Sequence, residues 1–179
     1  MTVVSDTSPV NYLAQIGQER LLQALFGEIT IPSSVLAELS HAGAPLEIQC
    51  LLSQRPAWLN VAKCETAAPA ELGHLGPGER DAILLAVELR ADLVLIDESR
   101  GRQAAEKLGL AVTGTIGILD RAARKGLVEG KEMAARLRAT SFRATPRLLA
   151  SLAEVIEKPA ATRPESKPEA DFDNRHQAE

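Results

Sequence analysis

Acidic side chains follow two apolar runs of this chain, and their position predicts a shared site. Asp6 closes the run at 2–5, and Asp97 with Glu98 closes the run at 93–96. If these runs are strands of an open parallel sheet, their carboxyl ends converge on one crevice together with the starts of the helices that follow. Carboxylates gathered there repel one another unless a cation neutralises them, and such hard oxygen ligands suit Mg²⁺ or Mn²⁺. The pattern therefore predicts a metal-dependent enzyme that acts on a phosphate-bearing substrate.

Three further acids lie on segments predicted to be helical near the same crevice. Glu38 lies on the helix that follows the apolar run at 29–31. Glu79 and Asp81 lie in the first turn of an apolar helix that starts at Gly78. Residues two apart in a helix point about 200° apart. One of these two acids can therefore face the crevice while the other stabilises the helix start, and the sequence leaves both assignments open.

Each acid also has an ordinary structural explanation. Asp6 can cap a helix that has Pro9 in its first turn, and Glu38 alone is an ordinary helix residue. Asp97 and Glu98 give the strongest local signal, because a buried parallel strand has little structural need for two carboxylates at its end. The acids taken together, more than any one of them, indicate a cation site.

The elements that must position these acids alternate between short β-rich runs and helical patterns. This alternation is typical of βαβ units, and it predicts a three-layer α/β/α sandwich with a central parallel sheet of about five strands. The strands are expected at 2–5, 29–31, 59–62, 93–96 and 111–113. The helices are expected at 9–16, 19–26, 33–41, 45–54, 78–90, 99–108, 115–125, 130–139 and 146–156. Proline and glycine breakers predict a connecting loop at 65–77.

The composition favours one domain over residues 1–156, followed by a disordered tail. Of the 179 residues, 45% are hydrophobic, which is enough to build a full core. The tail at 157–179 is polar and has too few apolar residues to offset its ordering entropy. No apolar run approaches the roughly 18–20 residues that span a bilayer, and no basic region precedes the first apolar stretch as in a signal peptide. Cys50 and Cys64 lack metal-ligand spacing. We therefore expect a cytoplasmic protein that does not enter the membrane.

The net charge of −4 conceals an asymmetry along the chain. Residues 1–98 carry 13 acidic and 5 basic side chains, whereas residues 99–149 carry 4 acidic and 11 basic ones. A basic flank beside an acidic metal site suits a polyanion, because phosphate contacts supply much of the affinity for nucleic acid. The alternative is that these charges are solvated helix faces.

Other catalytic arrangements are absent from the sequence. No serine stands in a G-x-S-x-G context, and there is neither a Walker-type phosphate loop nor a G-x-G-x-x-G after a strand. The histidines form no ligand pair; they are His41, His74 and His176. The acids therefore remain the candidate chemical groups.

Five segments of the chain together form a pattern that is more specific than any one of them. They are Val4-Ser5-Asp6-Thr7-Ser8-Pro9, Ile31-Pro32-Ser33-Ser34-Val35-Leu36-Ala37-Glu38, Gly76-Pro77-Gly78-Glu79-Arg80-Asp81-Ala82-Ile83, Leu95-Ile96-Asp97-Glu98 and Val112-Thr113-Gly114-Thr115-Ile116-Gly117-Ile118-Leu119. In this order they resemble the PIN domain family over residues 1–156. The resemblance is to the branch of VapC-like toxins of toxin–antitoxin systems, and most closely to a PIN-related group of bacterial and archaeal nucleic-acid-binding proteins. It implies a metal-dependent endoribonuclease.

The resemblance also implies roles for single residues. The family's four catalytic acids are matched by Asp6, Glu38, Asp81 and Asp97. The predicted metal ligands are Asp6, Glu79, Asp81, Asp97 and Glu98. The predicted substrate-binding residues are Thr7, Ser8, Ser99, Arg100 and Arg102. Glu79 can take the third acidic position in place of Asp81, and Glu98 stands where many relatives of the broader fold have no acid.

The expected chemistry is hydrolysis of phosphodiester bonds in single-stranded RNA. One or two Mg²⁺ or Mn²⁺ ions would lower the pKa of a bound water and stabilise charge on the phosphate. Arginines of the basic flank would hold the RNA backbone. Because aromatic residues make up only 3% of the chain, base-specific recognition by stacking is not expected.

Two other functional classes compete with this hypothesis. A phospho-receiver module would also gather acids around Mg²⁺, but it needs a lysine at the end of a late strand, and residues 112–114 contain none. A catalytically silent PIN-like module would keep the fold only to bind a partner. Mn²⁺ titration separates such a module from a nuclease, because only the nuclease should bind the metal tightly.

The toxin resemblance further implies a small antitoxin protein as partner, and a homodimer is also expected. Helices at 9–26 and 33–54 carry more apolar side chains than one face of a small sheet requires. These are Leu13, Ile16, Leu21, Leu22, Leu25, Leu36, Leu39, Leu51 and Leu52. Core packing can explain them, and a surplus groove would suit an amphipathic antitoxin helix or a second copy of the chain.

Overall fold

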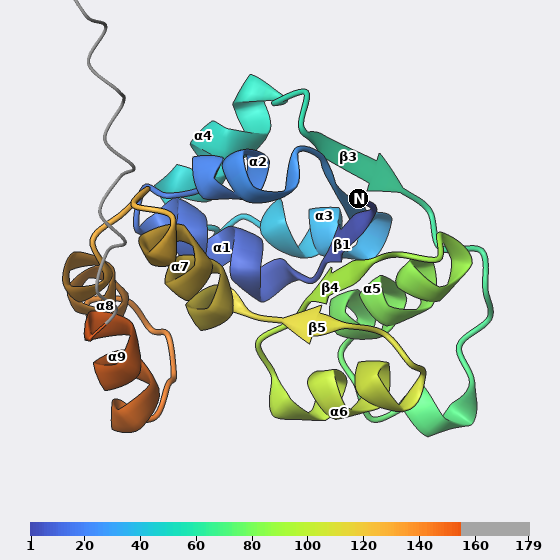
Figure 1. The fold of residues 1–179 in the computed structure, drawn as a ribbon. Helices are drawn as coiled ribbons and strands as arrows, with labels where there is room; N and C mark the ends of the chain where they lie inside the picture. The colour runs from blue at the N-terminus through green and yellow to red at the C-terminus, as the bar shows by residue number, and fades with distance from the viewer. Residues whose placement is uncertain (155–179) are drawn as a thin grey trace, which may run out of the picture.

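A parallel sheet of five strands runs through the protein in the order β3-β2-β1-β4-β5 (Figure 1). The computed structural model describes residues 1–154, so the tail predicted to be disordered at 157–179 lies outside the described residues. The strands are β1 (Val3–Ser5), β2 (Ile29–Pro32), β3 (Leu59–Ala62), β4 (Leu93–Leu95) and β5 (Val112–Thr113). All lie within the predicted runs or extend them by one residue.

Helices cover both faces of this sheet, which gives the predicted three-layer α/β/α architecture. They are α1 (Thr7–Gln15), α2 (Arg20–Phe26), α3 (Ser33–Leu39), α4 (Leu46–Gln54), α5 (Pro77–Glu88), α6 (Ser99–Lys107), α7 (Thr115–Arg124), α8 (Gly130–Arg138) and α9 (Pro146–Ala153). The predicted loop at 65–77 contains a short 3₁₀ turn at Ala70–Leu72, and its last residue, Pro77, is the first residue of α5. None of the helices in the described part has the length and apolarity needed to cross a membrane.

The alternation of side chains along the strands divides the apolar interior into two cores. Val3 faces a larger core formed with α1, α2, α4 and α7, whereas Val4 faces a smaller core formed with α5 and α6. Leu95 and Val94 of β4 divide in the same way. Neighbouring strand residues point to opposite faces of a sheet, and all four of these side chains are buried. Val, Ile and Leu therefore dominate the central strands, and the buried Ser5 lies at the end of β1.

The strand register brings the ends of three strands to one level. Ser5 pairs with Leu95, and Leu95 pairs with Thr113. The ladder continues one step further, because the Asp6 N–H donates to the Leu95 carbonyl at 2.9 Å and the Ile96 N–H donates to the Thr113 carbonyl at 2.8 Å. The segments that follow β1, β4 and β5 therefore leave the sheet side by side.

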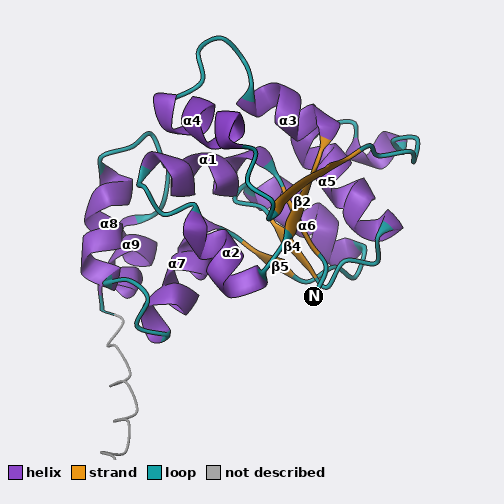
Figure 2. Cartoon of the chain, turned by 90° about the horizontal axis from the view of Figure 1, so that it is seen from above, coloured by secondary structure: helices purple, strands orange, loops and turns teal. Residues whose placement is uncertain are grey.

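Helices α8 and α9 pack together beside α7, away from α5 and α6 (Figures 1 and 2). Met133 and Leu137 of α8 and Leu152 of α9 are buried in the larger core. The connection between the two helices is held against α1, where Phe142 meets Tyr12 edge-to-face at a centroid distance of 4.8 Å. The carboxyl-terminal helices thus extend the molecule on the side where β5 leads into α7.

Candidate active site

Four acids from separate elements gather where β1 and β4 end. Asp6 follows β1, Asp97 lies two residues after β4, Glu38 belongs to α3 and Glu79 to the first turn of α5. Asp6 and Glu79 are the two buried charged residues of the described chain, with 6% and 7% of their surface exposed. Buried carboxylates are rare without a compensating charge. This pair therefore marks the centre of the site.

The negative charges of two other acids act on Asp6. Its pKa is raised from 3.8 to about 6, chiefly because burial disfavours the charged form, and the negative charges of Glu38 and Asp97 raise it further. The backbone N–H groups of Thr7 and Ser8 at the start of α1 act in the opposite direction. The surroundings of Asp6 therefore disfavour its charged form, in spite of these N–H groups.

The pKa of Glu79 is raised further than that of Asp6, and one of its carboxylate oxygens has no hydrogen-bond partner in the described residues. Its pKa is raised from 4.5 to about 7, first by burial and then by the charges of Glu98 and Asp6, while backbone N–H groups at Gly101 and Gly76 lower it. Its buried Oε1 atom accepts no hydrogen bond from the described residues. A buried carboxylate oxygen without a donor needs either a proton or a cation.

Glu38 connects the starts of two helices. Its Oε1 accepts from the backbone N–H of Gly78, near the start of α5, at 2.9 Å. Its Oε2 accepts from the hydroxyl of Thr7, the first residue of α1. The position of Glu38 in α3 is therefore explained by contacts within the site, although the residue gives almost no signal in the sequence.

Asp97 is held by a single residue, Thr115, at the start of α7. Its Oδ1 accepts from the Thr115 backbone N–H at 2.7 Å, and its Oδ2 accepts from the Thr115 hydroxyl at 2.6 Å. Burial raises the pKa of Asp97, whereas these hydrogen bonds and the charge of Arg102 lower it in part. Thr115 is itself fully buried. Nothing in the sequence indicated this role for Thr115.

Each of the four acids therefore faces the beginning of a different helix. Asp6 faces α1, Glu38 faces α5, Glu79 faces α6 and Asp97 faces α7. Free N–H groups and the helix dipole favour negative charge at these ends. Gly101 and Gly114 allow the close approach, because a Cβ on either would overlap the carboxylate of Glu79 or Asp97.

Asp81, one of the two acids predicted for the third position, lies outside this group. Its carboxylate pairs with Arg80, with an Nε–Oδ1 distance of 3.1 Å. It shares a face of α5 with Glu88, near the Cys64 thiol, whose pKa is raised chiefly by burial and also by these two carboxylates. The 200° separation around the helix explains the difference. Glu79 alone lies in the first turn of α5, and of these two acids the fold brings Glu79 to the site.

The remaining predicted residues surround the acids at different depths. Glu98 is exposed at the start of α6, close enough for its charge to raise the pKa of Glu79. Ser8 contributes its backbone N–H to Asp6. Arg102 donates from Nη1 to the Ile96 carbonyl at 3.2 Å and lies beside Asp97. Arg100 is exposed on α6 and makes no hydrogen bond or ion pair within the described chain.

The acidic group suits a hard divalent cation by its donor chemistry. In the part of the chain that the structure describes, no three His, Cys, Asp or Glu side chains stand ready as a complete coordination shell. The unpartnered Oε1 of Glu79 and the raised pKa of Asp6 nevertheless indicate negative charge without its counter-ion. All the available donors are carboxylate oxygens, the type that Mg²⁺ and Mn²⁺ prefer.

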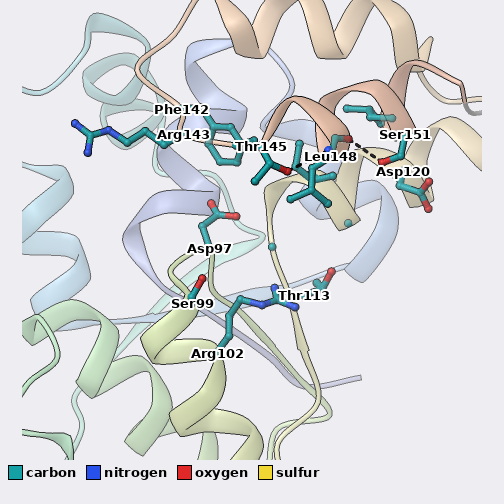
Figure 3. A pocket seen from close by; sticks show the side chains of 15 residues that line it. Asp97, Ser99, Arg102, Thr113, Asp120, Phe142, Arg143, Thr145, Leu148 and Ser151 are labelled. Carbon is teal, nitrogen blue, oxygen red and sulfur yellow. Dashed lines mark hydrogen bonds between the residues drawn. The ribbon is translucent and has the colours of Figure 1, made fainter.

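A pocket of about 540 Å³ adjoins the site at Asp97 (Figure 3). Ser99 and Arg102 of α6 lie on one side of it, and Phe142, Arg143 and further residues of the segment at 142–152 lie on the other. The pocket is thus shared between the sheet edge and the carboxyl-terminal helices. Sequence analysis gave no indication of it.

Comparisons with known proteins agree with this architecture. A family model described as a PIN domain matches residues 2–158. A solved structure, a PilT N-terminus domain protein from the hyperthermophilic archaeon Sulfolobus solfataricus P2, superposes with a TM-score of 0.51 at 19% sequence identity. The match covers 68% of this chain and 93% of that protein. No curated protein matches the sequence.

Proposed function

Because the chain belongs to the PIN domain family, whose members are generally nucleases that use divalent metal ions, we propose that it is a metal-dependent endoribonuclease. Its substrate would be single-stranded RNA, and its reaction the hydrolysis of phosphodiester bonds. The observation that carries the proposal is the group of four acids at the strand ends, two of which are buried, with Glu79 Oε1 unpartnered and the pKa of Asp6 raised to about 6.

The four acids have different parts in this proposal. Asp6, Glu79 and Asp97 would hold Mg²⁺ or Mn²⁺, which when bound lowers the pKa of a coordinated water and offsets charge on the phosphate. Glu38 holds Thr7 and the start of α5, and so fixes the helix that carries Glu79. Thr115 fixes the orientation of Asp97 through two hydrogen bonds.

A polyanionic substrate is supported by the charge around the acids. Residues 99–149 carry 11 basic and 4 acidic side chains, and Arg102 and Arg143 line the pocket beside Asp97. Arginines at the rim of a catalytic site can position a phosphodiester backbone without reading its sequence. The basic half of the chain would thus hold the RNA while the acidic half cleaves it.

The test is cleavage of a labelled single-stranded RNA by the purified protein with Mg²⁺, Mn²⁺ or EDTA. We expect cleavage that needs the metal and is lost in Asp6→Asn. Calorimetric titration with Mn²⁺ provides the second readout, with tight binding to the wild type and weak binding to the variant. An intact RNA together with equal Mn²⁺ binding by both proteins would instead favour the silent interaction module.

We further propose that the nuclease acts in the cytoplasm as a toxin controlled by a small antitoxin. A free ribonuclease is hazardous to its own cell, which is the reason for a partner. Of the apolar residues in the first four helices, most belong to the core, whereas Leu36 and Leu52 are partly exposed. They line an apolar groove with Leu59 and Val61 at the β3 edge, which would suit an antitoxin helix or a second copy of the chain.

Co-expression tests this regulatory role. The chain would be produced with and without the small protein encoded beside it, followed by pull-down, size-exclusion chromatography and growth measurements. We expect growth arrest by the chain alone and rescue by its neighbour. A monomer that is harmless on overexpression and ignores its neighbour would contradict the toxin role and leave the nuclease proposal standing.

A further inference from the structure

The pocket beside Asp97 combines three kinds of surface. One wall comes from the β5–α7 junction, where Ile116 contributes an apolar side chain. The facing wall comes from the segment at 142–152, where Phe142 and Leu148 do the same. Arg102 and Arg143 lie on the two sides of Asp97, and the Arg143 guanidinium points away from the Asp97 carboxylate (Figure 3).

The apolar surfaces of this pocket are held in place and open to a ligand. Phe142 is fixed by its edge-to-face contact with Tyr12 at 4.8 Å. Leu148 is 48% exposed although it faces the pocket, so a ligand there would remove apolar surface from water. Thr145 caps α9 by accepting from the Leu148 N–H at 3.3 Å, which fixes the backbone beside it.

The charged surfaces are available for a phosphate. Arg143 forms no ion pair with a carboxylate of the described chain, and Arg102 lies near Asp97 without forming an ion pair at contact distance. Arg143 is exposed, so its guanidinium does not contribute to the packing of the fold. An arginine without a carboxylate partner next to an apolar slot is the combination that binds a nucleotide, since one part takes the phosphate and the other takes the base.

We propose that this pocket takes one unpaired nucleotide of the RNA strand, adjacent to the phosphodiester that lies at the acids. This inference rests on the proposed nuclease function and extends it to substrate selection. The base packs against Phe142, Ile116 and Leu148, and its phosphate lies between Arg102 and Arg143. A volume of about 540 Å³ lies in the range of small-ligand pockets, roughly 300–1,000 Å³, and is too small for a duplex. Preference for single strands follows, because only an unpaired base can enter.

Paired variants and paired substrates test the pocket. Arg143→Ala removes one exposed pocket arginine, and Arg147→Ala removes an exposed arginine of the same segment that does not line the pocket. For single-stranded RNA we expect Arg143→Ala to raise KM about fivefold or more and Arg147→Ala to change it less than twofold. With bis(p-nitrophenyl) phosphate, which has no neighbouring nucleotide, Arg143→Ala should raise KM less than it does with single-stranded RNA. Equal RNA kinetics for the two variants would overturn the inference.

Photocrosslinking provides a second, independent readout. A single-stranded RNA carrying one 4-thiouridine, bound in the presence of Ca²⁺, should crosslink to the segment at 142–152. Crosslinks confined to other segments would overturn the inference even if the kinetics agree. Phe142→Leu, which keeps an apolar side chain, should lower the crosslinking yield and leave the melting temperature within a few degrees.

These experiments separate failure of the inference from failure of the proposed function. A wild-type protein that hydrolyses neither substrate with any metal contradicts the nuclease proposal. In that case RNA affinity, measured by fluorescence anisotropy in Ca²⁺, still decides the pocket. A loss of affinity in Arg143→Ala but not in Arg147→Ala supports it, and equal affinities overturn it.

Discussion

Asp97 and Glu79 belong to the same acidic group but are held in opposite ways. Both oxygens of Asp97 accept hydrogen bonds from Thr115, whereas Oε1 of Glu79 is buried and accepts none. The protein orients both oxygens of Asp97. Backbone N–H groups at Gly101 and Gly76 stabilise the charged form of Glu79 in part, but its Oε1 is left for a proton or a cation. The orientation of Asp97 is therefore fixed before any ligand binds, whereas the state of Glu79 depends on what binds.

The largest effect is expected at Asp6, whose charge interacts with those of both Asp97 and Glu79. Asp6→Asn should lower metal-dependent RNA cleavage by about 100-fold or more, because it removes a central charge for the cation. The variant should still fold and be as stable as the wild type in EDTA, since the substitution relieves repulsion. Steady-state cleavage and urea unfolding measure the two effects. Near-normal cleavage at limiting Mg²⁺ would contradict the assignment.

The next prediction contrasts Glu79 in the first turn of α5 with Asp81, which lies two residues further along the helix. Glu79→Gln should reduce cleavage by about 100-fold, whereas Asp81→Asn should change it less than threefold, because only Glu79 lies in the acidic group. Both substitutions remove one negative charge from the same helix turn, so each is the control for the other. The reverse ranking would restore Asp81 as the third acid.

A smaller effect is expected where the protein itself orients a carboxylate. Thr115→Val removes the hydroxyl that donates to Asp97 Oδ2 but keeps the backbone donor. We expect about a tenfold loss of cleavage, as for other groups that orient metal ligands, and about 1 kcal/mol of destabilisation. Thr115→Ser retains the hydroxyl and should recover most of the activity. If serine and valine variants behave alike, the hydroxyl does not orient Asp97.

The smallest effect concerns the stability of the metal-free protein against pH. The pKa of Asp6 is raised from 3.8 to about 6 and that of Glu79 from 4.5 to about 7, so the folded state holds these protons more tightly than the unfolded chain. Their contribution to the free energy of unfolding is therefore largest below about pH 4 and declines between about pH 4 and 7.

Urea unfolding in EDTA at pH 5 and pH 7.5 measures this decline. Glu79→Gln should lose about 1–2 kcal/mol less than the wild type between the two pH values, because it has no carboxyl group to titrate at that position. Adding Mg²⁺ at pH 7.5 should stabilise the wild type by mass action. If the stability of the two proteins depends on pH in the same way, the folded state does not raise the pKa of Glu79.

The fold and two of the acids could be predicted because they depend on local patterns. Strand ends follow from apolar runs, and parallel strands must present Asp6 and Asp97 at the same edge. The choice between Glu79 and Asp81 could not be made, because it depends on the rotation of α5 against its neighbours. That rotation is set by packing in the smaller core.

Two other features lay beyond the sequence for related reasons. A threonine after a glycine is common in turns, so nothing distinguished Thr115 before its contact with Asp97 was known. The pocket wall at 142–152 depends on how α9 packs against α7 and α8, and those contacts are tertiary. Core packing, one of the two explanations considered for the apolar residues of the first four helices, holds for most of them, and Leu36 and Leu52 are the partly buried exceptions.

The four acids and Thr115, which orients Asp97, are spread along the chain from Asp6 to Thr115. This spread has a consequence for biosynthesis. A chain still emerging from the ribosome lacks α7, and therefore lacks the donor pair that fixes Asp97, until Thr115 has left the exit tunnel. Partial translation products that end earlier cannot assemble the site. If the protein is the nuclease proposed here, messenger RNA under translation is exposed to it only after most of the domain has been synthesised. Completion of the fold then serves as the switch that begins activity.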